Sequence, residues 1–94
     1  LTYIYMKHRD ETVVDHAANE MGSMLRRWFG DRVLGPDRPA VARVKTLCIR
    51  KIVLKLELGI DMAKVRQYLR AAQKAMADDP RFRSVQTYFD VDPM

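Results

Sequence analysis

The chain has little of what builds disulfides, fibres or membrane spans: one cysteine, four glycines and four prolines in 94 residues. The single thiol of Cys48 excludes a disulfide within the chain and leaves no cysteine cluster for zinc, which fits a reducing compartment. No apolar run approaches the roughly 18 residues that cross a bilayer, and no basic leader followed by an apolar stretch opens the sequence. We therefore expect one globular domain without a membrane-spanning segment.

Groupings of side chains that do chemistry are also missing. The possible nucleophiles and bases are Ser23, Ser84, Cys48, His8 and His16, and no known spacing links them. None of the four glycines belongs to a phosphate-binding loop that ends in Lys-Ser or Lys-Thr. Asp90 and Asp92 share a strand face and could hold a divalent ion, but pairing with nearby Arg or Lys is the stronger interpretation. The sequence predicts no catalytic, metal or cofactor site in this chain.

Positive charge is concentrated in one segment. The net charge is +5, and residues 41–55 carry five basic side chains and no acid, whereas the rest has 12 basic and 12 acidic side chains. The five are Arg43, Lys45, Arg50, Lys51 and Lys55. Such a concentration attracts phosphates, because binding releases their condensed counterions. The same pattern also protects a solvated strand from edge pairing, so charge alone leaves both interpretations open.

Two stretches repeat apolar residues at helical spacing. In the first, Asp10 can cap a helix, Gly30 can end it, and the stripe comprises Val14, Ala17, Met21, Leu25 and Trp28. Trp28 and Phe29 are predicted core anchors. In the second, Asp61 can cap the helix and Pro80 stops it, since proline cannot continue a helix. Its stripe comprises Met62, Val65, Tyr68, Leu69, Ala72, Ala75 and Met76.

Strand patterns occupy the remaining segments. Residues 2–7 and 85–92 alternate apolar and polar side chains, residues 31–36 predict a short strand, and Gly35-Pro36 indicates a loop. Residues 41–58 would extend about 60 Å as one strand, so they must bend, and we place the turn near Thr46-Leu47-Cys48. The order strand, helix, strand, strand, helix, strand predicts an α+β fold, a split βαβ (βαββαβ) with two helices on one face of a mostly antiparallel sheet.

Four pieces of the sequence occur in an order and spacing that is specific as a set. They are Arg32-Val-Leu-Gly-Pro36, Pro39-Ala-Val-Ala-Arg43, Ile49-Arg-Lys-Ile-Val-Leu-Lys55 and Phe89-Asp-Val-Asp-Pro93. In these pieces the chain resembles the C-terminal domain of PriA-type replication-restart helicases, the primosomal protein N′ family. The similarity covers nearly the whole chain. It implies that residues 1–94 are one accessory domain excised from a longer protein, as the strand-like start at Leu1 also suggests.

The resemblance implies a fold like ribosomal protein S10, attached to a bacterial, cytoplasmic, ATP-driven 3′-to-5′ DNA helicase that recognises stalled forks and loads the replicative helicase. ATP, magnesium and zinc are then expected only elsewhere in the parent protein. Arg43, Arg50 and Lys51 match the family's basic strand positions. Where the family often interleaves aromatic residues, this chain has Leu47, Cys48 and Ile49, which favours phosphate contact over base stacking.

Two partners follow from the same resemblance. Branched or single-stranded DNA is expected on Arg43, Lys45, Arg50, Lys51 and Lys55. Single-stranded-DNA-binding protein is expected on Lys64, Arg66 and Gln67, where a basic pocket could receive its acidic tail. The alternative is a protein-interaction or structural domain that docks on its own helicase core or on that protein without touching DNA. A third hypothesis, an independent RNA binder, also fits the charge.

Overall fold

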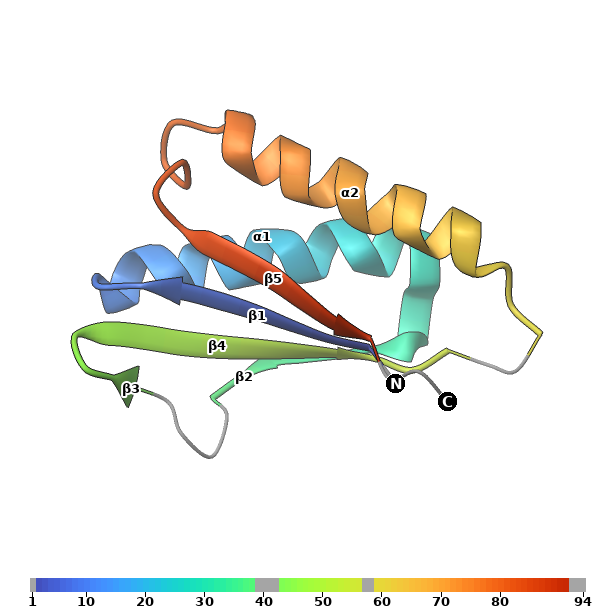
Figure 1. The fold of residues 1–94 in the computed structure, drawn as a ribbon, viewed down its shortest axis with the longest axis horizontal. Coiled ribbons are helices and arrows are strands. Elements are labelled where there is room, and N and C mark those ends of the chain that lie inside the picture. The colour runs from blue at the N-terminus through green and yellow to red at the C-terminus, as the bar shows by residue number, and fades with distance from the viewer. Residues whose placement is uncertain (1, 39–42, 57–58, 92–94) are drawn as a thin grey trace.

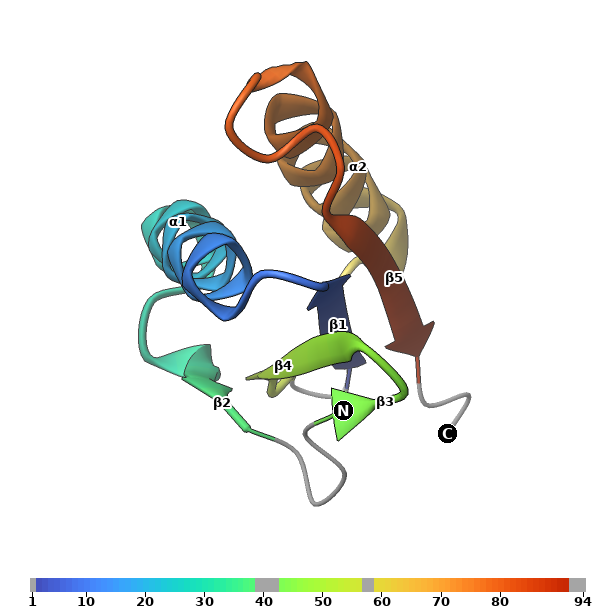
Figure 2. The same ribbon diagram turned by 90° about the vertical axis from the view of Figure 1, so that its left-hand side faces the viewer.

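The structure is a computed structural model that describes residues 2–38, 43–56 and 59–91. Its elements in chain order are β1 (Thr2–His8), α1 (Glu11–Phe29), the short 3-10 helix η1 (Gly30–Arg32), β2 (Val33–Asp37), β3 (Arg43–Val44), β4 (Leu47–Leu54), α2 (Met62–Asp78) and β5 (Gln86–Val91). Figures 1 and 2 show both helices on the same face of one sheet. The predicted α+β class and its split βαβ order are confirmed.

All strand pairs are antiparallel, and the sheet order is β2-β4-β1-β5, with the short β3 paired to β4. β1 lies between β4 and β5, so it forms ladders on both sides: Tyr5 is opposite Lys51 of β4 and Tyr88 of β5. Because side chains alternate along a strand, Ile4 and Met6 point toward the helices, whereas Tyr3, Tyr5 and Lys7 point away.

The core fills the space between the helices and the sheet. Its fully buried apolar side chains come from β1, β4, α1 and α2, and include Ile4, Met6, Val14, Met21, Leu25, Ile52, Leu54, Val65 and Leu69. The apolar stripes predicted from the sequence supply most of these residues. Burial of such side chains contributes about 1.5–3 kcal/mol each before the conformational entropy of the chain is counted.

Both predicted helix caps are present. The Asp10 carboxylate accepts hydrogen bonds from the backbone N–H groups of Thr12 and Val13, and Asp61 does the same for Ala63 and Lys64. A capping carboxylate satisfies amides that have no partner within the helix, which is worth about 1 kcal/mol. Asp10 and Asp61 thus fix where each helix begins over the sheet.

The prediction that Trp28 is a core anchor was wrong. Trp28 is 41% exposed, whereas its neighbour Phe29 is buried. At the end of α1 the stripe turns by one residue, so that Phe29 enters the core while Trp28 stacks on Tyr68 of α2, with ring centroids 5.0 Å apart. The aromatic pair joins the two helices at the surface.

Two local predictions are adjusted by the structure. The bend predicted for residues 41–58 falls at Lys45 and Thr46, where Lys45 adopts a left-handed φ of 57°. It lies at the start of the predicted Thr46-Leu47-Cys48, since Leu47 and Cys48 already belong to β4. Gly35 and Pro36 do not form a loop but lie within β2, where the register shifts between Leu34 and Asp37. Gly35 has φ +98°, and a Cβ there would lie 3.0 Å from the Lys51 carbonyl oxygen, so the irregularity depends on glycine.

Neither α1 nor α2, the two α-helices in the described ranges, has the length and apolarity that spanning a bilayer requires.

Candidate nucleic-acid interface

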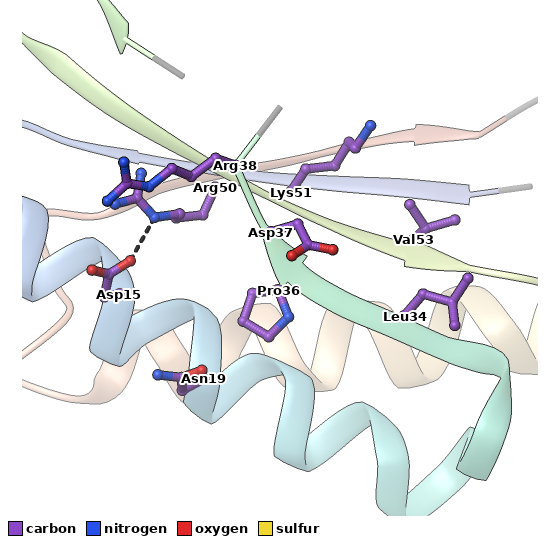
Figure 3. Close-up of a pocket in the computed structure, with 9 residues that line it drawn as sticks. All are labelled: Asp15, Asn19, Leu34, Pro36, Asp37, Arg38, Arg50, Lys51 and Val53. Carbon is purple, nitrogen blue, oxygen red and sulfur yellow. Dashed lines mark hydrogen bonds and ion pairs between the residues drawn. The ribbon is translucent and has the colours of Figure 1, made fainter. Parts of the chain in front are cut away.

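The basic residues of β4 are divided between the two sides of the sheet. Arg50 shares a face with Ile52 and Leu54 and points toward α1, whereas Lys51 shares a face with Val53 and points away from the helices. Figure 3 shows the Arg50 side chain directed at Asp15 of α1, with the Lys51 side chain extending in another direction. Neighbours in the sequence therefore have different surroundings.

Arg50 is only 5% exposed, and all three of its guanidinium nitrogens donate hydrogen bonds. Nε donates to the Asp15 carboxylate, Nη2 donates to Glu11 Oε1 at 2.9 Å, and Nη1 donates to the Ile49 carbonyl oxygen at 2.9 Å. The same Glu11 oxygen accepts a bond from Arg38 at 2.7 Å. Arg50 thus ties β4 to the first turns of α1.

The electrostatic surroundings keep Arg50 charged. Burial lowers the pKa of its guanidinium, but the hydrogen bond and charge of Asp15, together with those of Glu11, outweigh burial and raise the pKa above its ordinary value. Asp15 and Glu11 are each more than two-fifths exposed, so the pair network lies at the rim of the core. Arg50 is therefore a structural ion pair in this fold, not part of an exposed basic patch.

Four of the five predicted DNA-binding residues have described side chains, and these four, Lys45, Arg50, Lys51 and Lys55, do not form one patch. Lys45 is exposed in the turn that precedes β4, and Lys51 lies in the middle of that strand. Lys55 follows the other end of β4, where its backbone N–H donates to the Arg32 carbonyl oxygen at 2.8 Å and its side chain lines a hollow beside η1. Arg43 belongs to β3, which pairs with β4 at Cys48. Within the described residues, the lysines are spread along the strand and Arg50 faces the helices.

The face of the sheet that points away from the helices carries a different set of residues, which we call the open face. It comprises Tyr3, Tyr5 and Lys7 of β1, Leu34 and Asp37 of β2, Ile49, Lys51 and Val53 of β4, and Gln86, Tyr88 and Asp90 of β5. The register sets them in rows: Lys51, Tyr5 and Tyr88 stand side by side across three strands. Both described helices pack on the opposite side, as Figure 2 shows.

Aromatic rings and ammonium groups are in contact throughout this face. The Tyr5 and Tyr88 rings stack with centroids 5.1 Å apart and planes 20° apart, and the Tyr3 ring lies 6.4 Å from Tyr5. The Lys7 Nζ atom lies over the Tyr88 ring at 5.0 Å, and the Lys51 Nζ atom lies over Tyr3 at 5.5 Å. Three tyrosines thus form one group with a lysine at each end.

Sequence reasoning missed this group, although a signal was present. Tyr3, Tyr5 and Lys7 alternate with buried residues of β1, and Tyr88 has the same parity on β5. Aromatic residues that could stack on bases were expected only within the basic segment, near Leu47 and Ile49, where the chain has none. The pairing of β1 with both β4 and β5, which no single strand reveals, brings the rings and Lys51 together.

The surroundings of Tyr5 keep its hydroxyl protonated. Desolvation raises the pKa of the Tyr5 phenol, and the nearby Asp90 carboxylate and the phenols of Tyr88 and Tyr3 raise it further. The ring therefore presents a neutral hydrogen-bond donor at neutral pH.

The residues predicted for the protein partner lie in the first turns of α2, with Lys64 and Arg66 on different sides of the helix. Lys64, Arg66 and Gln67 are exposed in its first turns, and Lys64 is one turn before Tyr68 on the same side of the helix. The backbone N–H groups that could bind a peptide carboxylate are occupied by Asp61. Recognition of an acidic tail would therefore depend on the Lys64 and Arg66 side chains.

The side chains considered as nucleophiles, bases or metal ligands do not form a site within the described residues. Cys48 is buried. The His8 ring accepts a hydrogen bond from the Asp10 backbone N–H and contacts the Ser84 hydroxyl at 2.9 Å. Asp90 is exposed on β5, and Asp92 lies outside the described residues. Within the part of the chain that the structure describes, no three His, Cys, Asp or Glu side chains are grouped so that they could hold a metal ion.

Comparison with known proteins does not assign the chain to a family. The chain matches no protein-family model, and no curated protein has significant sequence similarity to it.

Proposed function

We propose that this chain is a nucleic-acid-binding accessory domain of a replication-restart DNA helicase, and that it holds phosphates with the lysines of the open face. The resemblance to the C-terminal domain of PriA-type helicases supplies the helicase context. The observation that carries the proposal is the placement of Lys7 and Lys51 at the two ends of a tyrosine group on the face without helices.

The distribution of carboxylates supports this surface. Glu11 and Asp15 are paired with Arg38 and Arg50 on the helix side, and Asp79 is paired with Arg81 beyond the end of α2. These acids do not neutralise the open-face lysines. Two acids lie on the open face with the two lysines: Asp90 of β5, and Asp37 of β2, which is opposite Lys51. Among the described residues, neither forms an ion pair with Lys7 or Lys51. The ammonium groups of Lys7 and Lys51 therefore remain available to phosphates, and such an attraction weakens as salt rises.

In this function the domain positions the parent protein on the nucleic acid and does not catalyse a reaction. Phosphate contacts fix the orientation of a protein on nucleic acid without reading its sequence. An accessory domain of this kind would hold one arm of a fork while the ATP-driven core of the parent acts on the other strands.

The test is a titration of a labelled forked DNA with the 94-residue chain at low and moderate salt, read by fluorescence anisotropy. We expect salt-dependent binding that Lys7→Glu with Lys51→Glu abolishes. The matched control is Arg70→Glu with Lys74→Glu, which makes the same charge change on exposed residues of α2. Equal losses for the two double variants, or no binding by the unaltered chain, would contradict the proposal.

A second candidate function is protein binding, favoured by the exposed Trp28–Tyr68 pair beside Lys64. An aromatic pair with a nearby lysine suits an acidic peptide with apolar side chains, such as the tail expected for single-stranded-DNA-binding protein. Binding of an acidic peptide by a chain that does not bind the forked DNA would favour this candidate.

A further inference from the structure

We infer that the open face binds single-stranded nucleic acid by stacking its bases on Tyr5 and Tyr88, while Lys7 and Lys51 hold the adjoining phosphates. This inference rests on the proposed nucleic-acid-binding function and specifies its ligand. It departs from the expectation of phosphate contact alone, which followed from the missing aromatics at Leu47 and Ile49.

The rings are partly accessible, and Tyr5 and Tyr88 already stack on one another, so a base would add to a ring face that the other ring leaves uncovered. Tyr88 is 43% exposed, and Tyr3 and Tyr5 are half-buried beside it. Tyr5 and Tyr88 lie nearly parallel, and they occupy neighbouring strands, which are about 4.8 Å apart in a sheet. Their positions are fixed by the backbone pairing of β1 with β5, so little conformational entropy is lost when a planar ligand binds.

A single strand suits this surface better than a duplex. Bases in a duplex are covered by their neighbours in the stack, whereas the bases of a single strand can turn onto aromatic side chains. Sheets that bind nucleic acid in this way hold about two or three bases on rings of adjacent strands.

The charges select a nucleic acid over an apolar peptide. An ammonium group contacts the ring at each end of the tyrosine group, at 5.0 Å for Lys7 and 5.5 Å for Lys51. A polyanion whose charges alternate with flat rings satisfies both kinds of group at once. A neutral peptide would leave the lysines without a counter-charge.

The experiment compares two labelled oligonucleotides of equal length: oligo-dT, and the same strand with abasic sites at its centre. Both carry the same phosphates. We expect the unaltered chain to bind the complete strand more tightly by about 5- to 150-fold for each stacked base. Tyr88→Leu should reduce that preference without changing the salt dependence, whereas Tyr88→Phe, which keeps the ring, should retain it. An oligo-U arm shows whether RNA is bound as well as DNA.

Two results would overturn the inference. One is equal affinity of the unaltered chain for the complete and abasic strands. The other is a Tyr88→Leu variant that weakens binding of a duplex as much as binding of oligo-dT. In both cases salt-dependent binding that Lys7→Glu with Lys51→Glu abolishes would leave the proposed function standing, whereas no binding of any oligonucleotide would remove both. Urea unfolding of each variant shows that the fold is intact.

Discussion

The two faces of the sheet differ in the surroundings of their basic side chains. On the helix side, Arg50 is buried, donates to Asp15 and Glu11, and serves as a link between β4 and α1. On the open face, Lys51 is the next residue in the sequence but its ammonium group lies over the Tyr3 ring and toward solvent. The comparison shows that a basic strand is not necessarily a basic surface, because strand alternation sends every second charge to the other side.

The same comparison holds for aromatic residues. Phe29 and Phe82 are buried on the helix side, whereas Tyr3, Tyr5 and Tyr88 lie on the open face. The phenol hydroxyl can remain in water while the ring packs against its neighbours, so tyrosine is suited to a face that is partly exposed. Rings on that face are available to a ligand, and rings in the core are not.

The largest difference between the faces should be seen in stability, with Ile52→Ala and Val53→Ala as the matched pair. Ile52 is fully buried in the core, and its truncation should lower the free energy of unfolding by about 2–5 kcal/mol. Val53 is half-buried on the open face, and its truncation should cost less than about 1 kcal/mol. Urea unfolding measures both values. Similar losses at the two positions would show that the open face is covered in solution.

A second pair, Arg50→Met and Lys51→Met, separates stability from binding. Loss of Arg50 leaves Asp15 and Glu11 without their partner, and should cost about 1–3 kcal/mol; the carboxylates are partly exposed and can turn to water, which limits the cost. Lys51→Met should change stability by at most about 0.5 kcal/mol but weaken DNA binding. Urea unfolding and anisotropy titrations check the pair. A stable Arg50→Met variant that fails to bind DNA would show that Arg50 belongs to the DNA-binding surface.

The smallest effect concerns pH. Since the pKa of Tyr5 is raised above 10.0 in the folded chain, the proton is held more tightly there than in the unfolded chain. The resulting stability is fully present below pH 10 and is lost as pH rises through the raised pKa of Tyr5. Asp90→Asn removes one cause and should lower the pKa, as a titration of phenolate absorbance would show. An unchanged titration would indicate that Asp90 does not act on Tyr5.

Much of the fold could be predicted from local pattern. The alternation of β1, the helical stripes and the caps at Asp10 and Asp61 are properties of short segments, and each appears in the structure as expected. Trp28 was misplaced because periodicity near a helix end does not decide which of two adjacent aromatics enters the core. Gly35 was misread because a glycine that belongs to a loop and a glycine that permits an irregular strand look the same in sequence.

The candidate site was less accessible to prediction. Charge counting identified the segment that contains Lys51, but it grouped Arg50 with it, since nothing in the segment indicates that Asp15 and Glu11 would lie beneath. The tyrosines were visible as an alternating pattern on β1. Their association with Tyr88 depends on a pairing between residues that are more than eighty positions apart.

The sequence by itself determined the elements of this protein: where strands and helices form, which side of each is apolar, and how much positive charge the chain carries. These follow from the spacing of side chains along short segments, which is a local property. Only the tertiary structure decided which charges are neutralised and which rings meet. Strand order and register bring distant residues within a few ångströms, and so give Arg50 its carboxylates and Tyr5 its neighbours Tyr88 and Lys51.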